Sequence, residues 1–197
     1  MNISGLINSF RVFYNPALFV PNLTVSKFHQ IPLPIPAFKG KPISLVILDK
    51  DNCFAEPHGN IVYPEYQPFW TKLKSEYPGN KLLIVSNTAG SEQDIGNRQA
   101  RLLENNTGVK VFRHSIKKPG CHVEIVEYAK SLGIKDPGQI VVIGDRLMTD
   151  VVMANLMGAS SIWVRDGVVA ARGPLTAIEK MFYDRVGHKW VKKDTPE

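Results

Sequence analysis

The sequence has few cysteines, no long apolar run and, in its first quarter, no acidic residue. Two cysteines, Cys53 and Cys121, are too few for a disulfide framework and form no metal-ligand pattern, which indicates a reducing compartment. No stretch approaches the roughly 20 apolar residues that span a bilayer, so we expect a chain that does not cross one. The acid-free residues 1–48 carry four cations, namely Arg11, Lys27, Lys39 and Lys41. This bias fits chance, a targeting sequence or a surface that approaches negative charge.

What the chain does contain is sufficient for a packed core. Its 197 residues, 44% hydrophobic and 21% charged, fit one globular domain with a small appendage. The formal net charge of +6 indicates an acidic partner. Nucleic acid, an anionic membrane and a phosphorylated substrate all meet that description.

The first 38 residues differ in pattern from the rest. Within residues 2–14, apolar side chains recur at helical spacing: Ile3, Leu6, Ile7, Phe10, and Phe13 or Tyr14. In residues 31–36 every second residue is proline, which predicts a stiff, extended linker. We therefore expect residues 1–38 to be a membrane-associating segment with its linker, and residues 39–197 to be the folded domain. The amphipathic helix has three interpretations: a membrane anchor, a helix packed on the core, or a mitochondrial targeting signal.

From residue 39 onward, short apolar runs alternate with helical patterns. Strands are expected at 43–48, 81–85, 109–112, 139–143 and 161–164. Helices are expected at 64–76, 91–106, 119–132, 149–157 and 174–185. This alternation predicts an α/β fold, a Rossmann-like three-layer α/β/α sandwich with a parallel sheet.

Polar clusters follow the expected strands. They lie at 49–53, 86–90 and 144–150, and two lysines, Lys117 and Lys118, lie just before an expected helix. In an open α/β sheet, ligands bind beyond the carboxyl ends of the strands. Four such clusters in order therefore indicate a single site at that edge.

These clusters resemble the four motifs of the haloacid-dehalogenase-like phosphatases: DxDx[T/V], a Ser or Thr after the second strand, a Lys, and GDxxxxD. The resemblance runs from about residue 43 to residue 164. It departs at Cys53, where the family usually has Thr or Val; this cysteine has no base partner, and we expect it to pack under the loop. The family implies Mg²⁺-dependent hydrolysis of a phosphate monoester through a phospho-aspartate.

Phosphoryl transfer requires a nucleophile surrounded by cations and hydrogen-bond donors. Asp49 is the candidate nucleophile, since a carboxylate forms an acyl-phosphate that water later opens. Asp51 is the candidate general acid for the leaving alkoxide and then the base for water. Lys118, with Lys117 as the alternative, supplies the cation.

The phosphate and the metal ion need further ligands. We expect Ser86 and Asn87 to bind the phosphate, whereas Arg146 reaches either that phosphate or a surface carboxylate. Carboxylates repel one another unless a cation lies between them, and hard oxygen ligands favour Mg²⁺. The expected ligands are the side chains of Asp49 and Asp145 and, as in the family, the backbone carbonyl of Asp51. Asp150 is a third acid at the ion, directly or through water, or an anchor for the lysine.

The spans between the motifs limit what covers the site. From Cys53 to Ser86 and from Ser86 to Lys118 they must already supply strands and helices, and below about 40 residues a separate domain rarely folds. We therefore expect an uncapped site, open to a phosphate presented by a protein, a nucleic acid or a membrane.

Four longer strings narrow the resemblance: LDKDNC, SNTAG, IKKPG and GDRLMTDVVMANLMG. Together they are similar to the mitochondrial phosphatidylglycerophosphate phosphatases. That likeness implies conversion of phosphatidylglycerophosphate to phosphatidylglycerol for cardiolipin synthesis, on an anionic membrane surface at the matrix face of the inner membrane, with no nucleic-acid partner. Two alternatives stay open: a phosphatase of phosphoproteins or nucleic-acid ends, and a catalytically silent membrane-binding scaffold.

Overall fold

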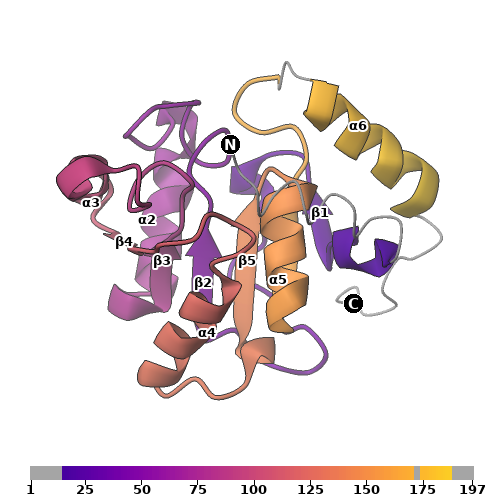
Figure 1. The fold of residues 1–197 in the computed structure, drawn as a ribbon, viewed down its shortest axis with the longest axis horizontal. Helices are drawn as coiled ribbons and strands as arrows, with labels where there is room; N and C mark the ends of the chain where they lie inside the picture. The colour runs from indigo at the N-terminus through magenta and orange to yellow at the C-terminus, as the bar shows by residue number, and fades with distance from the viewer. Residues whose placement is uncertain (1–14, 171–173, 188–197) are drawn as a thin grey trace.

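The computed structural model of the protein describes residues 15–170 and 174–187. Its centre is a parallel sheet with the strand order β1-β6-β5-β2-β3-β4 (Figure 1). The strands are β1 (Leu23–Val25), β2 (Leu45–Leu48), β3 (Leu82–Ile84), β4 (Lys110–Val111), β5 (Ile140–Gly144) and β6 (Ser160–Val164). The predicted α/β class with an all-parallel sheet is confirmed.

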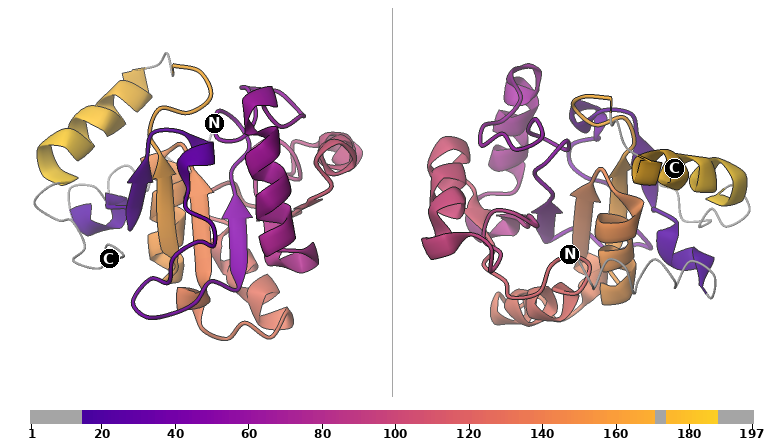
Figure 2. Two further views of the ribbon diagram at one scale, coloured as in Figure 1. Left: turned by 180° about the vertical axis from the view of Figure 1, so that it is seen from behind. Right: turned by 45° about the horizontal axis from the view of Figure 1, so that its top comes forward.

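Helices cover both faces of this sheet. They are α2 (Gln67–Glu76), α3 (Arg98–Thr107), α4 (His122–Ser131), α5 (Val152–Met157) and α6 (Pro174–Phe182). Helices α4 and α5 lie on one face and α2 on the other (Figures 1 and 2). A π-helical turn, Leu147–Val151, leads from β5 into α5. Across residues 15–170 and 174–187 no separate domain is inserted, and no helix there is both long and apolar enough to cross a membrane.

The central strands are apolar at every position because both of their faces are covered. In β2 all four side chains are buried. Val46 and Leu48 pack in the cluster that includes α2, whereas Leu45 and Ile47 pack against α4 and α5. The strand thus separates two cores and holds its carboxyl end, where Asp49 follows, in a fixed place.

The segment before residue 39 differs from the predicted linker. Its strand β1 pairs in parallel with β6 at the edge of the sheet, and Phe28, Ile31 and Ile35 are buried in the core on the α2 side. Figure 2 (left) shows this segment crossing the face that α4 and α5 leave uncovered. The only helices in this described stretch are two short 3-10 helices, Pro16–Phe19 and Phe28–Gln30, and its apolar residues bury against the sheet. Among the described residues, the chain just before Lys39 therefore packs on the domain that follows it instead of standing apart as a linker. The amphipathic stretch at 2–14 lies outside the described residues.

A second difference concerns the helix expected from residue 91, which begins only at Arg98. Gly96 and Asn97 adopt left-handed backbone angles, with φ of 64° and 55°, and interrupt the helix before it starts. The Asp94 carboxylate accepts hydrogen bonds from the amides of Gln99 and Ala100, at 2.9 Å each, in the first turn of α3. A compact loop thus replaces the first two predicted turns and keeps residues 86–97 at the carboxyl edge.

Candidate active site

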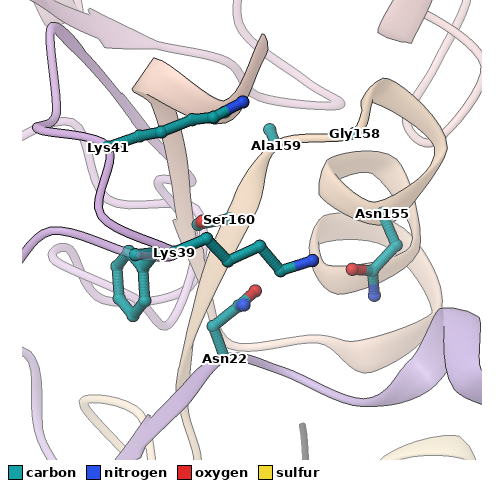
Figure 3. Close-up of a pocket in the computed structure, with 9 residues that line it drawn as sticks. Asn22, Lys39, Lys41, Asn155, Gly158, Ala159 and Ser160 are labelled. Atoms are coloured by element: carbon teal, nitrogen blue, oxygen red, sulfur yellow. The ribbon is translucent and has the colours of Figure 1, made fainter. Parts of the chain in front are cut away.

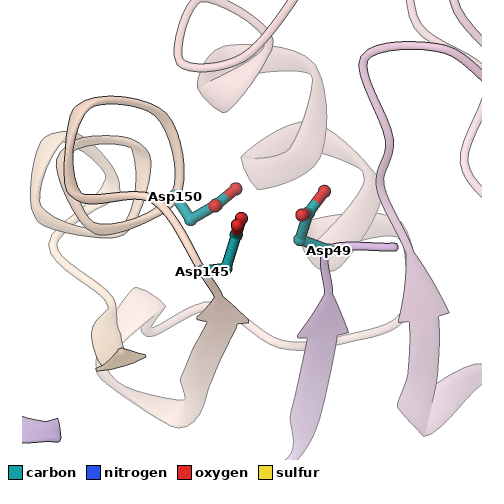
Figure 4. Close-up of side chains that lie close together, drawn as sticks. All are labelled: Asp49, Asp145 and Asp150. Atoms are coloured by element: carbon teal, nitrogen blue, oxygen red, sulfur yellow. The ribbon is translucent and has the colours of Figure 1, made fainter. Parts of the chain in front are cut away.

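Three aspartates converge at the carboxyl edge of the sheet. Asp49 directly follows β2, Asp145 follows the neighbouring strand β5, and Asp150 lies in the π-helical turn. Each offers a carboxylate oxygen, and these oxygens lie within 4.8 Å of one another. Figure 4 shows the three side chains pointing toward a common centre. The topology therefore brings together acids that are up to about a hundred residues apart in the sequence.

The environment of these acids fits a divalent cation. The pKa of Asp49 is raised to about 6, because burial, with the charges of Asp150 and Asp51, outweighs the opposing charge and hydrogen bond of Lys118. Burial and the charge of Asp49 raise the pKa of Asp145 well above its usual value. One Asp145 oxygen, Oδ1, is buried without a hydrogen-bond partner in the described structure. Clustered buried carboxylates with a free oxygen are the donor set that Mg²⁺ prefers.

Lys118 lies within this acidic cluster. Its Nζ is 2.5 Å from Asp49 Oδ1 and 2.7 Å from Asp150 Oδ1. Burial alone would lower the pKa of this lysine, but the two carboxylates outweigh burial and hold the pKa above its ordinary value. Lys117, by contrast, is directed to the exposed Gln93, whose Oε1 accepts its hydrogen bond at 2.7 Å. The structure therefore brings Lys118, and not Lys117, to the aspartates.

Asp51 stands beside the cluster and stays partly accessible, with 30% of its side chain exposed. Its Oδ1 accepts hydrogen bonds from Lys50 Nζ at 2.6 Å and from the His58 amide at 2.7 Å. Its Oδ2 accepts one from Thr88 Oγ1 at 3.3 Å. A carboxyl group fixed in this way and still open to solvent can exchange a proton with substrate and with water.

The three residues expected at the phosphate have different surroundings. Ser86 is buried, and its Oγ lies 2.9 Å from Thr88 Oγ1. The two hydroxyls thus lie together on the side of Asp51, which accepts a hydrogen bond from Thr88. Asn87 instead positions the lysine loop, since its Oδ1 accepts a hydrogen bond from the Lys118 amide at 2.7 Å. Arg146 has a buried Nε without a hydrogen-bond partner among the described residues. Its positive charge acts on the Glu179 carboxyl group, whose pKa it lowers against the larger effect of burial. The structure thus places Arg146 near a carboxylate, one of its two expected partners, and leaves its contact with the phosphate a prediction.

Asp150 has both carboxylate oxygens in hydrogen bonds. Oδ1 faces Lys118, and Oδ2 accepts a hydrogen bond from the Arg146 amide at 3.2 Å. Gly144 allows this close approach, because a Cβ at that position would lie 2.3 Å from the Asp150 carboxyl carbon. Of the two predicted roles for Asp150, these contacts favour the anchor for the lysine.

Cys53 is fully buried in the loop that follows β2 and begins with Asp49. Burial raises the pKa of its thiol well above the usual range, and the neighbouring aspartates add to this effect. A thiol of this kind is not a nucleophile at neutral pH. The cysteine packs under the loop as expected.

Sequence reasoning missed several residues at the site. Lys50 and Thr88 hold Asp51, Asn52 holds Asp145, and the ring nitrogens of His114 lie 2.9 Å from the Ser86 carbonyl oxygen and 2.8 Å from that of Ile116. Thr88 and Asn52 lie inside the predicted clusters, which was the available signal. His114 lies outside them, and no pattern in the sequence indicates its bridge between two loops.

A separate pocket lies at the opposite, amino edge of the sheet (Figure 3). Lys39 extends between Asn22 and Asn155, and Lys41 lies nearby. The described residues that line it include no acid, so it offers neither a carboxylate nucleophile nor carboxylate ligands for a metal ion. The chemistry therefore belongs to the carboxyl edge.

Comparison with known proteins places the chain in a family. The sequence profile of the family described as mitochondrial PGP phosphatase matches residues 3–169. The mitochondrial phosphatidylglycerophosphatase GEP4 of Saccharomyces cerevisiae is 49% identical over 95% of this chain and 100% of that protein. A probable mitochondrial phosphatidylglycerophosphatase of Schizosaccharomyces pombe is 28% identical over 94% of this chain and 93% of that protein.

Among solved structures, an uncharacterized protein from Listeria monocytogenes aligns with a TM-score of 0.47 at 21% identity, over 68% of this chain and 86% of that one. The family profile covers every predicted motif, from the Asp49 loop through the Asp150 turn. The chain belongs to the mitochondrial PGP phosphatase family.

Proposed function

We propose that this chain is a Mg²⁺-dependent phosphatase of the haloacid-dehalogenase-like type that converts phosphatidylglycerophosphate to phosphatidylglycerol for cardiolipin synthesis. Its proposed place is the matrix face of the mitochondrial inner membrane, as a peripheral protein. The observation that carries the proposal is the buried group of Asp49, Asp145 and Lys118 at one edge of the sheet. We infer the substrate from the similar proteins, which are named phosphatidylglycerophosphatases.

In the proposed reaction, Asp49 attacks phosphorus and the bond to the glycerol oxygen breaks. Asp51 gives its proton to that leaving oxygen, which leaves a phospho-aspartate at position 49. Asp51 then takes a proton from a water molecule, whose oxygen attacks phosphorus and releases phosphate. Lys118 and Arg146 stabilise the charge on the phosphoryl oxygens, and Ser86 donates a hydrogen bond to them.

Mg²⁺ would be held by the side chains of Asp49 and Asp145 and by the Asp51 carbonyl. When bound, it neutralises the anions that must approach one another during phosphoryl transfer. Lys118 keeps Asp49 and Asp150 from repelling one another, and Asn52 orients Asp145. The residues of the chain thus set the positions of all the acids.

Of the eight exposed large apolar residues of the described chain, four lie in loops at the edge that carries the site, and the other four lie on helices α3, α4 and α6: Leu102, Val123, Ile178 and Met181. The loops that follow β2, β3, β4 and β6 each expose one: Ile61 (57%), Ile95 (83%), Ile116 (50%) and Val169 (41%). In the described chain, none of the exposed large apolar residues lies in the amino-edge turns at 77–81, 108–109, 132–139 or 158–159. A lipid phosphate reaches Asp49 only if the bilayer faces the carboxyl edge, and exposed aliphatic groups suit that contact.

The rival enzyme function is an open phosphatase of phosphoproteins or nucleic-acid ends. We would compare phosphatidylglycerophosphate in vesicles with a phosphopeptide and a 5′-phosphorylated oligonucleotide, each with and without Mg²⁺. Faster turnover of either soluble substrate would overturn the lipid assignment. Activity that survives removal of Mg²⁺ would overturn the metal requirement.

A substitution series separates the enzyme from a silent scaffold. Asp49→Asn should abolish turnover, because the amide cannot attack phosphorus. Asp136→Asn is the matched control, since Asp136 lies before β5 at the opposite edge and pairs with Lys41. Equal activity of the wild type and Asp49→Asn would refute the mechanism.

A further inference from the structure

Lys50 is a buried cation that lies between Asp49 and Asp51 in the sequence, and the proposed reaction gives it no role. Its residue is 1% exposed, and it is among the largest fully buried side chains of the described chain. A buried ammonium group is costly unless it is paired and hydrogen-bonded. A lysine in this place therefore needs a specific set of acceptors.

The acceptors of Lys50 define what it does. Its Nζ donates to Asp51 Oδ1 at 2.6 Å and to the Gly59 carbonyl at 2.9 Å. Its own carbonyl accepts from the amides of Cys53 and Ala55, which closes the turn after Asp51. The side chain thus ties the Asp51 carboxyl to a second segment of the same loop, eight residues further along the chain.

This contact assigns different tasks to the two oxygens of Asp51. Oδ1 receives both Lys50 Nζ and the His58 amide, so it already accepts two hydrogen bonds. Oδ2 receives only the longer, 3.3 Å contact from Thr88 Oγ1, on the side where Ser86 and the catalytic cluster lie. Oδ2 is therefore the oxygen that remains available to carry the transferred proton.

We propose that Lys50 is a positioning residue that fixes Asp51 Oδ1 against the 56–59 turn so that Oδ2 delivers the proton to the leaving group. The inference rests on the proposed function, because it needs Asp51 to act as the general acid. Lys50 itself is too deeply buried to touch the substrate, and it acts through Asp51 alone.

The test uses two esters whose leaving groups differ in their need for a proton. An alkoxide, as in a short-chain phosphatidylglycerophosphate, leaves poorly without one, whereas p-nitrophenolate leaves without help. For Lys50→Met we expect kcat/KM on the alkyl ester to fall roughly 10- to 100-fold, part of the 10²–10⁴-fold that a general acid supplies. On p-nitrophenyl phosphate, kcat/KM should change by less than about 3-fold, since proton transfer contributes little to that reaction.

The ratio of the two values is measured in one preparation, so it does not depend on the fraction of protein that is folded. Lys50→Arg, which keeps the charge and the donors, should restore most of the alkyl-ester activity. Should Lys50→Met fail to fold, Lys50→Gln gives the same comparison. Asp51→Asn should lower the same ratio of kcat/KM values, which reports the first phosphoryl transfer and not the later hydrolysis of the phospho-aspartate that both esters share. Adding Lys50→Met to Asp51→Asn should cause no further change in the ratio.

The possible outcomes distinguish a failure of the role of Lys50 from a failure of the proposed phosphatase function. Equal losses on both esters, or an unchanged ratio, would overturn the positioning role and leave the phosphatase function intact. Further loss of the ratio in the double variant would likewise exclude action through Asp51. A wild-type protein that hydrolyses neither ester would overturn the proposed function and, with it, this inference.

Discussion

Asn52 donates a hydrogen bond from Nδ2 to Asp145 Oδ2 at 3.3 Å and leaves the other oxygen of Asp145 buried without a partner among the described residues. The amide orientation is fixed, because Asn52 Oδ1 accepts a hydrogen bond from the Val169 amide at 2.9 Å. Asn52 therefore holds Asp145 so that its free oxygen faces the centre shared with Asp49. Loss of an outer contact of this kind typically lowers metal affinity or activity by about 10- to 100-fold.

Asn52→Gly should raise the Mg²⁺ concentration for half-maximal activity roughly 10-fold, the lower end for loss of such a contact. The backbone tolerates the change, since Asn52 has a φ of 59°, which suits glycine. A Mg²⁺ titration of turnover measures the effect. Asn97→Gly is the matched control, with a similar φ of 55° in a loop that does not touch Asp145. An unchanged Mg²⁺ requirement in Asn52→Gly would contradict the role of Asn52.

Asp145 and Asp150 should respond differently to the same substitution. Each oxygen of Asp150 already accepts a hydrogen bond, Oδ1 from Lys118 and Oδ2 from the Arg146 amide, whereas Asp145 Oδ1 accepts none among the described residues. Asp150→Asn should lower kcat by misplacing Lys118 while shifting the Mg²⁺ half-saturation by less than about 3-fold. Asp145→Asn should raise that half-saturation at least about 10-fold, because a ligand is lost. Equal shifts would identify Asp150 as a direct ligand.

Much of the site could be predicted because the topology does most of the positioning. Asp49 and Asp145 each follow an apolar run, and such runs in an alternating pattern form neighbouring parallel strands. The motif residues therefore meet at one edge whatever the details of the loops. Lys50 and His114 could not be assigned, since their contacts depend on the path of a loop and on rotamers that no periodicity encodes.

For the segment at residues 16–38, the sequence did not predict how the chain packs. The prolines at 31–36 predict an extended chain, and residues 31–36 are indeed not helical, but composition does not say what an extended chain packs against. Phe28 lies 5.1 Å from the Phe69 ring, edge to face, and Ile35 donates its amide to the Tyr77 hydroxyl. These long-range contacts turn an apparent linker into a layer of the core. The sequence carries the apolar residues but not the identity of their partners.

Asp94 should contribute to stability in a pH-dependent way. Burial raises the pKa of its carboxyl group, but hydrogen bonds from the amides of Gly90, Gln99 and Ala100 outweigh burial and hold the pKa below its usual value. A group with a depressed pKa stabilises the fold above its unfolded pKa, about 3.9, and loses this contribution as the pH falls through the folded value. Asp94→Ala should lower the free energy of unfolding by about 1–2 kcal/mol at pH 7.

The difference between the wild type and Asp94→Ala should shrink steadily once the pH falls below about 4. Urea unfolding at several pH values measures it. Glu92→Ala, an exposed acid in the same loop, should stay within about 0.5 kcal/mol of the wild type at every pH. A stability difference for Asp94→Ala that persists unchanged at low pH would show that packing, and not the carboxylate, is responsible.

Ile95 provides a test of which edge faces the membrane, because it is 83% exposed in the loop that follows β3. Ile95→Asp should weaken binding to phosphatidylcholine–phosphatidylglycerol vesicles about 10-fold, since part of the 1.5–3 kcal/mol from burying an isoleucine is lost. Asn80→Asp adds the same charge to an exposed turn at the amino edge and should bind vesicles like the wild type. Both variants should turn over p-nitrophenyl phosphate at wild-type rates, because neither side chain contacts the aspartate cluster. Co-sedimentation with vesicles measures the binding, and equal effects of the two substitutions would place the membrane contact elsewhere than on the carboxyl edge.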